Sequence, residues 1–269
     1  SLSYLENLSI ARAIKKWRPE VPIILGGVHA QGLPEICATE DCFDFVIPGE
    51  GEITFYKLLQ AIESGSDIKD IKGIYYMDNG KLKNTGSGEL VENLDDLPLP
   101  ARHLLHDLHS YHQKAFAYRK MPNTSIFTQR GCPFGCVFCS SSKQFRTLFD
   151  KKVRAHSIDY VRREIQELTT RWGIREIYFA DDTFNLIKER VYEMCDMIRT
   201  NFPNLVWSCN FEANIASKKL IRTMKDSGCW LIQIGVETGN AEVMKEIKKG
   251  IRLEQVESVC HMAAEEGMA

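Results

Sequence analysis

The sequence predicts an α/β protein in which a partial, doubly wound parallel sheet of the flavodoxin or Rossmann kind is followed by a partial (β/α) barrel. Three observations support this fold class. Residues 1–66 alternate helical and strand-like hydrophobic patterns, residues 121–269 repeat strand and then helix with regularity, and a looser stretch separates the two. Such alternation with short connections is typical of parallel sheets covered by helices.

The composition excludes several classes of protein. The chain has 269 residues, of which 44% are hydrophobic and 26% charged, an ordinary balance for one large or two medium domains. Its formal net charge of −2 provides no general attraction to nucleic acid, and no apolar run approaches the roughly 20 residues that span a bilayer. We therefore expect neither a nucleic-acid partner nor a membrane span. The nine cysteines are unevenly placed, which favours a reducing compartment such as the cytoplasm over a disulfide framework.

The first module, residues 1–70, is predicted to be the later part of a doubly wound domain. Two strands are too few for such a sheet, and the chain opens inside a helical pattern, so we expect the sequence to lack the beginning of this domain. The elements, in order, are a helix over residues 5–14, a strand at 21–25, a short helix from about residue 33, a strand at 43–47 and a helix with apolar residues at 55–62.

Residues 71–120 are predicted to form a hairpin and a linker. Asp78-Asn79-Gly80 separates two short strand-like runs, and this tripeptide is a strong signal for a β-hairpin turn. The acidic, proline-bearing stretch 94–100 then leads to the second module.

The second module, residues 121–269, is predicted to be the first four β/α units of a barrel. Ser157 and Gly173 provide N-cap and C-cap signals for the first helix. The sequence ends where a fifth strand is expected, so we expect this module to be truncated as well. The predicted strands are 124–128, 176–180, 205–209 and 231–235, with helices at 158–172, 188–202 and 217–228.

Three cysteines lie on one loop directly after the first strand of this module. Cys132, Cys136 and Cys139 have the spacing C-x3-C-x2-C, and the loops after barrel strands form the active-site face. Cysteine thiolates suit an iron–sulfur cluster or zinc. Structural zinc needs four ligands, but a second cysteine pair is absent and the nearest candidate, His156, is a plain helix-entry residue. We favour a [4Fe–4S] cluster with one open iron, and structural zinc remains the alternative.

The cysteine loop resembles the signature of the radical S-adenosylmethionine (SAM) superfamily, in which an aromatic residue, here Phe138, precedes the last cysteine. The resemblance implies a (β/α)6 radical SAM barrel in which SAM chelates the open iron. One electron from the cluster then cleaves SAM to methionine and a 5′-deoxyadenosyl radical, which abstracts hydrogen from an inert position. The protein positions and shields these species.

Polar residues follow the other three strands, at the edge where SAM is expected. Asp181 and Asp182 follow the second strand, Asn210 and Glu212 the third, and Glu237 the fourth. Carboxylates and amides at this edge suit the ammonium and ribose hydroxyls of SAM. The segments around Asp182 and Glu237 resemble the motifs of the cobalamin-dependent subgroup. Loop capping and salt bridges within the barrel are the structural alternatives for these residues.

The first module resembles the later half of the cobalamin (B12)-binding domain that precedes the barrel in this subgroup. Glycine-rich turns follow both of its strands, and by themselves they would be ordinary tight turns. The resemblance implies that they approach the nucleotide tail of the cofactor, as ligands do at the carboxyl ends of doubly wound sheets. We expect His29 to be a tail or loop contact and not the cobalt ligand. The implied pocket residues are Gly26, Gly27, His29, Gly49, Glu50 and Gly51.

The resemblance covers nearly the whole chain and implies an enzyme that binds a [4Fe–4S] cluster, SAM and cobalamin. Methyl transfer to an unactivated carbon or phosphorus is the favoured reaction. Cobalamin-assisted oxidation or ring closure, as in the anaerobic magnesium-protoporphyrin monomethyl ester cyclases, is the first alternative. A sensor module without catalysis is the second. The implied partners are a small-molecule substrate and an electron donor such as flavodoxin or ferredoxin.

Overall fold

The computed structural model describes residues 3–111, 118–141 and 153–269, and the chain divides into two compact units. The first unit comprises Ser1–Glu92 and a segment that begins at Cys139. The second comprises Asn93–Phe138 and a later segment that ends at Ala269. Within the described ranges, no helix is long and apolar enough to cross a membrane.

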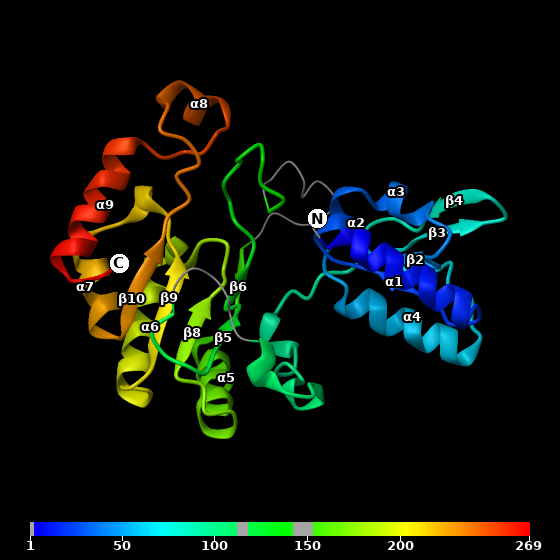
Figure 1. The fold of residues 1–269 in the computed structure, drawn as a ribbon, viewed down its shortest axis with the longest axis horizontal. Coiled ribbons are helices and arrows are strands. Elements are labelled where there is room, and N and C mark those ends of the chain that lie inside the picture. The colour runs from blue at the N-terminus through cyan, green and yellow to red at the C-terminus, as the bar shows by residue number, and fades with distance from the viewer. Residues whose placement is uncertain (1–2, 112–117, 142–152) are drawn as a thin grey trace. The chain divides into compact units, whose positions relative to one another are not determined.

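The first unit contains one four-stranded sheet with the order β1-β2-β3-β4 (Figure 1). Strands β1 and β2 are parallel, as the alternating pattern predicts, whereas β3 is antiparallel to both of its neighbours. Its elements are α1 (Tyr4–Trp17), β1 (Ile24–Leu25), α2 (Val28–Gly32), α3 (Pro34–Ala38), β2 (Phe45–Val46), α4 (Glu52–Ser64), β3 (Tyr75–Asp78) and β4 (Lys81–Asn84).

The predicted hairpin within residues 71–120 is formed by β3 and β4. Val46 of β2 pairs with Tyr75 of β3, so the hairpin extends the sheet of the first unit. The adjacent Ile74 is fully buried beside Leu58 of α4. The local turn signal correctly predicts the hairpin, but the long-range pairing with β2 has no signature in its sequence.

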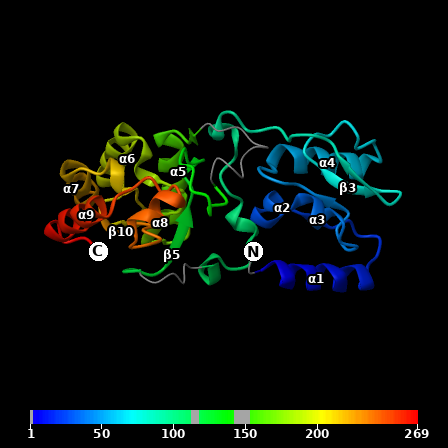
Figure 2. The same cartoon turned by 90° about the horizontal axis from the view of Figure 1, so that it is seen from above.

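The second unit is built on a four-stranded parallel sheet with the order β10-β9-β8-β5, which confirms the predicted partial barrel. Figure 2 shows α5, α6 and α7 in a row along this sheet. The main elements are β5 (Asn123–Ile126), α5 (Ile158–Arg171), β8 (Glu176–Phe179), α6 (Lys188–Asn201), β9 (Val206–Asn210), α7 (Lys218–Asp226), β10 (Cys229–Gln233), α8 (Ala241–Glu246) and α9 (Leu253–Glu265).

Shorter elements complete this unit. Strands β6 (Gln129–Arg130) and β7 (Arg154–Ala155) form a small antiparallel ladder next to the cysteine loop. Ala269 makes two hydrogen bonds with β10, donating to Trp230 O and accepting from Ile232 N, in the pattern of a parallel pair. The 3₁₀ helices are η1 (Leu94–Asp96), η2 (Arg102–Leu104), η3 (Leu108–Tyr111), η4 (Phe184–Leu186) and η5 (Ala213–Ile215).

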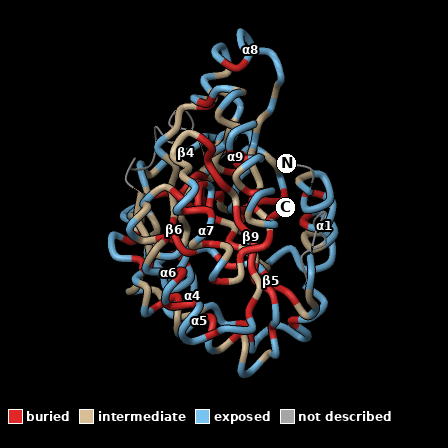
Figure 3. Tube along the Cα trace, turned by 90° about the vertical axis from the view of Figure 1, so that its left-hand side faces the viewer, coloured by how far each residue is buried: buried red, intermediate tan, exposed pale blue. Residues whose placement is uncertain are grey.

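Aromatic packing holds the carboxyl edge of this sheet to the hydrophobic core. Trp207 and Phe179 are fully buried, and the rings of Phe179, Phe184 and Trp207 contact one another with centroids 4.9 to 5.3 Å apart. Figure 3 shows buried residues along β9. Phe184 directly follows the polar segment after β8, so its burial fixes that segment against the sheet. Each such ring contributes about 2 kcal/mol through burial.

The scattered cysteines are small core residues, as predicted. Cys37, Cys42, Cys195, Cys209 and Cys229 are buried, and only Cys260 among the predicted six is exposed. Burial raises the pKa of Cys195 to about 12. A thiol with such a pKa stays protonated at neutral pH and is a poor metal ligand.

Replacement of Ser157 tests the helix boundary predicted at α5. The Ser157 hydroxyl oxygen accepts a hydrogen bond from Tyr160 N and so caps the first turn of the helix. We expect Ser157→Ala to lower the free energy of unfolding by about 1 kcal/mol. Chemical denaturation measures this change, and Ser87→Ala in an exposed loop is the control. Equal stability of the two variants would contradict the capping role.

Candidate functional site

The cysteine loop, Gly131–Cys139, begins at the end of β6, close to the carboxyl edge of the parallel sheet. Gly131 has a φ of 97°, a left-handed conformation that turns the chain immediately before Cys132. Cys136 is buried, Cys132 and Cys139 are partly buried, and Phe138 is half exposed. All nine cysteines lie in the described part of the chain and are thiols, not disulfides.

Asp181 anchors the strand end from which the cysteine loop departs. One carboxylate oxygen accepts hydrogen bonds from Thr128 N at 2.6 Å and Gln129 N at 3.0 Å, and the other accepts from the Thr128 hydroxyl at 2.6 Å. The side chain is fully buried. Its oxygens therefore accept hydrogen bonds within the protein, and the predicted contact of Asp181 with a cofactor stays a prediction. These bonds hold Thr128 and Gln129, which directly precede the cysteine loop.

The electrostatic setting of Asp181 combines burial with several donors. Burial raises the pKa of Asp181 to about 6, while the hydrogen bonds from Thr128 and Gln129 and the charge of Arg190 lower it. Arg190 also donates a hydrogen bond to Thr128 O at 3.1 Å, so this guanidinium braces the same strand end. The sequence pattern around the cysteines contains no signal for Arg190, which lies on α6.

Thr183 is a second contact of the cysteine loop that sequence reasoning missed. Its hydroxyl lies 3.6 Å from Cys132 Sγ. Its carbonyl accepts a hydrogen bond from the side-chain amide of Gln129. The end of β8 thus supports the loop through both Asp181 and Thr183. Asp182, between them, is exposed.

The three cysteines fit a cluster by their chemistry and their placement on one short loop. Within the described residues, no group of three or more histidine, cysteine, aspartate or glutamate side chains is arranged as metal ligands. Thiolate sites commonly form together with the metal, because the metal compensates the repulsion between the ligands. The assignment of Cys132, Cys136 and Cys139 as ligands stays a prediction.

The ends of β9 and β10 place further polar groups at the same edge of the sheet. Asn210 accepts a hydrogen bond from the Tyr178 hydroxyl at 2.6 Å and donates to Asp181 O at 3.0 Å, so it braces the neighbouring strand end. Glu212 is buried, and burial raises its pKa although Lys249 lowers it. Glu237 is exposed and has a positive φ of 65°. An exposed carboxylate held by a strained backbone is typical of a binding residue.

The glycine-rich turns of the first unit line a pocket of about 400 Å³ at the ends of β1 and β2. A methyl group on Gly26 or Gly51 would meet its nearest neighbour at 3.7 Å, an ordinary contact, so the packing of the chain does not itself require glycine there. Gly27 and Gly49 have positive φ values of 85° and 79°. The lining residues are Ile24, Gly26, Gly27, Ile47, Gly49, Gly51, Glu52 and Phe55.

Four of the six residues predicted for the cobalamin site therefore line this pocket, and His29 and Glu50 are not among its lining residues. The imidazole of His29 stacks on Tyr4 of α1, with ring centroids 3.8 Å apart. Ile24, Ile47 and Phe55 supply an apolar wall that the sequence pattern did not single out. Apolar walls with a bare backbone suit a flat or bulky organic ligand.

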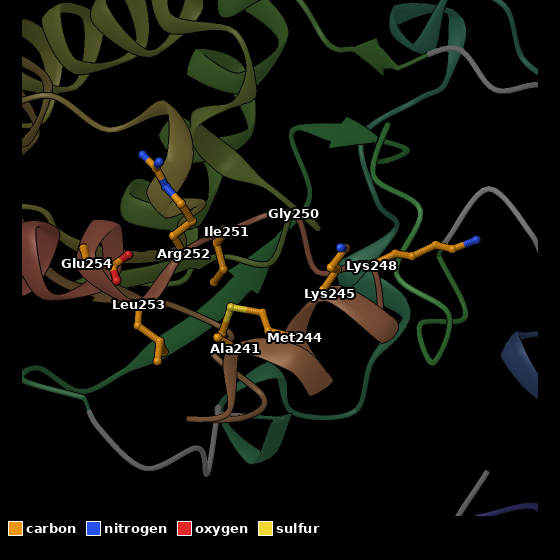
Figure 4. A pocket seen from close by; sticks show the side chains of 9 residues that line it. All are labelled: Ala241, Met244, Lys245, Lys248, Gly250, Ile251, Arg252, Leu253 and Glu254. Carbon is orange, nitrogen blue, oxygen red and sulfur yellow. The ribbon is translucent and has the colours of Figure 1, made fainter.

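A second pocket, of about 570 Å³, lies between α8 and α9 in the second unit (Figure 4). Met244, Ile251 and Leu253 supply its apolar surface, and Lys245, Lys248 and Arg252 are basic residues around it. Figure 4 shows the Lys248 side chain extending away from the other lining side chains. The loop between α8 and α9 also contacts the cysteine loop, because Val137 N donates a hydrogen bond to Ile247 O at 3.1 Å.

The second unit is a partial (β/α) barrel with a C-x3-C-x2-C loop at the carboxyl edge of its parallel sheet. Residues 126–269 match the family model described as the radical SAM superfamily, which covers more than half of the chain. The chain belongs to the radical SAM superfamily.

Curated relatives with similar sequences include enzymes of several kinds. An uncharacterised methyltransferase of Pyrococcus horikoshii is 35% identical over 92% of this chain and 52% of the relative. Cytidylyl-2-hydroxyethylphosphonate methyltransferase of Streptomyces wedmorensis is 25% identical over 93% of this chain and 51% of the relative. The anaerobic magnesium-protoporphyrin IX monomethyl ester cyclase of Cereibacter sphaeroides is 25% identical over 86% of this chain and 37% of the relative. The chain thus spans about half the length, or less, of these relatives.

Solved structures of the same fold cover almost the whole chain. The radical SAM methyltransferase TsrM from Kitasatospora setae, with tryptophan and a SAM analogue bound, matches 98% of this chain and 51% of its own with a TM-score of 0.78 and 18% identity. The cobalamin-dependent radical SAM enzyme OxsB, with aqua-cobalamin and SAM bound, matches 94% of this chain and 36% of its own, with a TM-score of 0.76 and 20% identity. At these identities the likeness establishes the fold of both units.

Proposed function

We propose that this chain is the cofactor-binding part of a cobalamin-dependent radical SAM methyltransferase. The observation that carries the proposal is the placement of the C-x3-C-x2-C loop at the carboxyl edge of the parallel sheet, braced there by Asp181 and Thr183. A glycine-lined pocket at the corresponding edge of the other sheet supplies the second cofactor site. Membership of the radical SAM superfamily and the methyltransferases among its relatives support the same function.

Cys132, Cys136 and Cys139 would hold the [4Fe–4S] cluster, and Asp182 and Glu237 would contact SAM. The donor set fits, because three thiolates leave one iron of the cluster open to a further ligand. When bound, the cluster supplies the electron for reductive cleavage of SAM. Asp182 and Glu237 both carry exposed carboxylates, which suit the ammonium and hydroxyl groups of SAM. We propose that Asn210 and Glu212 support the SAM site indirectly. Asn210 donates a hydrogen bond to Asp181 O, and the buried Glu212 forms an ion pair with Lys249.

Cobalamin would bind in the pocket of the first unit. A Cβ on Gly26 or Gly51 would meet Ile47 at 3.7 Å, an ordinary contact, so a ligand can approach the bare backbone there, and Phe55 adds an aromatic wall. When bound, cobalamin supplies a methyl group for transfer. We propose His29 and Glu50 as contacts at the margin of the pocket. Glu50 stands between the lining residues Gly49 and Gly51, and His29 follows the lining residue Gly27 by two positions.

Methyl transfer is favoured over cyclisation because the most similar of the three relatives above is a methyltransferase. The experiment has two parts. Anaerobically reconstituted protein is reduced with dithionite and SAM, and 5′-deoxyadenosine is measured by mass spectrometry; its formation supports an enzyme and excludes a sensor without catalysis. Candidate small molecules are then offered with methyl-labelled SAM. Label in the product supports methyl transfer. An oxidised or cyclised product without label would favour the cyclase-type reaction instead.

An electron donor of the flavodoxin or ferredoxin type is part of the proposal, because reductive cleavage of SAM consumes one electron per event. A reducing compartment, and hence the cytoplasm, is proposed on the same chemistry, since both the thiol ligands and the cluster need protection from oxidants. Support of 5′-deoxyadenosine formation by reduced flavodoxin in place of dithionite tests the donor.

Replacement of Gly26 tests the cobalamin pocket. Gly26 has an ordinary φ, and a Cβ there would meet Ile47 O at an ordinary 3.7 Å, so Gly26→Leu extends into the pocket without straining the backbone. We expect bound cobalamin, measured by its visible absorbance after gel filtration, to fall by about tenfold or more because the side chain occupies ligand volume. Gly32→Ala, at an exposed glycine outside the pocket, is the control. Normal cobalamin retention by Gly26→Leu would place the cofactor elsewhere.

A further inference from the structure

The loop between α8 and α9 bridges two parts of the candidate SAM site. Ile247 O accepts a hydrogen bond from Val137 N of the cysteine loop at 3.1 Å. Two residues further on, Lys249 Nζ lies 3.7 Å from Glu212 Oε2, at the end of β9. The next residue, Gly250, accepts a hydrogen bond through its carbonyl oxygen from Asn214 Nδ2 at 3.2 Å. This bridging loop, residues 247–250, therefore ties the cysteine loop to the strand end after β9.

Lys249 is the one charged side chain of the bridging loop that is largely buried. Its side chain is 13% exposed and that of Glu212 is 7% exposed, whereas Lys248 is exposed. Burying an ammonium is costly unless it is paired, so the position of Lys249 depends on the carboxylates around it. Glu212 Oε1 is also buried and has no hydrogen-bond partner among the described residues. The Lys249–Glu212 ion pair therefore leaves one carboxylate oxygen of Glu212, Oε1, without a donor among the described residues.

Lys249 also lies close to Glu237. A methyl group placed on Gly235 would be 2.7 Å from Glu237 Oε1 and 3.5 Å from Lys249 Nζ, so both groups lie beside the bare Cα of Gly235, although the ion pair of Lys249 is with Glu212. Glu237 belongs to the segment after β10 that the sequence predicts as a SAM contact. Lys249 is therefore shared between a buried carboxylate that holds it and an exposed carboxylate that it can orient.

We propose that Lys249 is a positioning residue for SAM, and this inference rests on the proposed function. Held by Glu212, its ammonium orients the Glu237 carboxylate towards the ligand, while the same loop steadies Val137 between Cys136 and Phe138. SAM affinity then depends on Lys249, although assembly of the cluster on the three thiols does not.

The test compares three variants of the whole chain after anaerobic reconstitution. We measure iron and sulfide content, thermal stability, and the SAM concentration that half-saturates the change in the EPR spectrum of the reduced cluster. For Lys249→Met we expect normal iron content and about tenfold weaker SAM binding, because an interaction with a charged group is lost. Lys249→Arg, which keeps the charge, should recover most of the affinity. Lys248→Met, the same change one residue earlier on an exposed side chain, should bind SAM normally.

Two outcomes would overturn the assignment. Normal SAM affinity in Lys249→Met would show that Glu237 does not depend on the ammonium. Equal losses of iron content and SAM affinity, with no recovery in Lys249→Arg, would show a general role in folding. A failure of the proposed function is distinguishable, because the wild-type cluster would then show no response to SAM.

Discussion

Cys136→Ala should abolish the iron–sulfur cluster. Wild-type protein, reconstituted anaerobically with iron and sulfide and then reduced, should give the EPR signal of a [4Fe–4S]⁺ cluster that changes when SAM is added. Cys136 is the buried member of the three cysteines and is adjacent to Val137, which the bridging loop holds in place. If the three thiolates are the protein ligands of the cluster, as proposed, removal of one leaves too few ligands to retain it. We expect loss of nearly all cluster iron and of 5′-deoxyadenosine formation.

Cys260→Ala is the matched control, since Cys260 is an exposed thiol on α9. It should retain full iron content and the response to SAM. Zinc in place of iron in the wild-type protein, or an unchanged EPR signal in Cys136→Ala, would return the cysteine loop to a structural role. A cluster that forms normally but ignores SAM would instead point to the contacts assigned to Asp182 and Glu237.

Local sequence signals predicted most of the second unit. The four strands were expected at 124–128, 176–180, 205–209 and 231–235, and each overlaps a strand of the sheet. Ser157 caps α5 as expected, because the N-cap interaction depends only on residues three apart. The first unit was less predictable. Its two parallel strands are two residues long each, and the antiparallel hairpin beside them depends on pairing between residues 46 and 75.

The candidate site shows the same division between local and long-range information. The cysteine spacing and the glycine turns are contained in short segments, so the sequence revealed them. The supporting contacts join distant segments: Asp181 holds Thr128 across 53 residues, and Thr183 meets Cys132 across 51. The sequence identified Asp181 as a polar residue at a strand end, but only its burial separates a positioning role from ligand contact. Lys249 could not be singled out, since it stands beside Lys248 in a stretch of ordinary surface appearance.

Asp181 should have the largest effect on stability among the residues that support the site. In Asp181→Ala the amides of Thr128 and Gln129 lose their acceptor in a buried position. A buried donor without a partner costs about 1 to 3 kcal/mol. We therefore expect about 3 to 5 kcal/mol less stability for the two together with the Thr128 hydroxyl, and reduced cluster retention, because the cysteine loop departs from these residues. Chemical denaturation and iron content measure both effects.

The raised pKa of Asp181 adds a pH dependence whose sign is fixed. Its pKa is about 6 in the folded protein and 3.8 in the unfolded chain, so the folded state binds the proton more tightly. Stability contributed by this group is present below about pH 4, declines as the pH rises through 6, and amounts to about 3 kcal/mol. Asp181→Asn, whose amide oxygen can still accept from both backbone amides, should remove this decline. Denaturation at pH 4 and pH 8 should show wild type losing more stability than Asp181→Asn, and identical losses would contradict the assignment of this titration to Asp181.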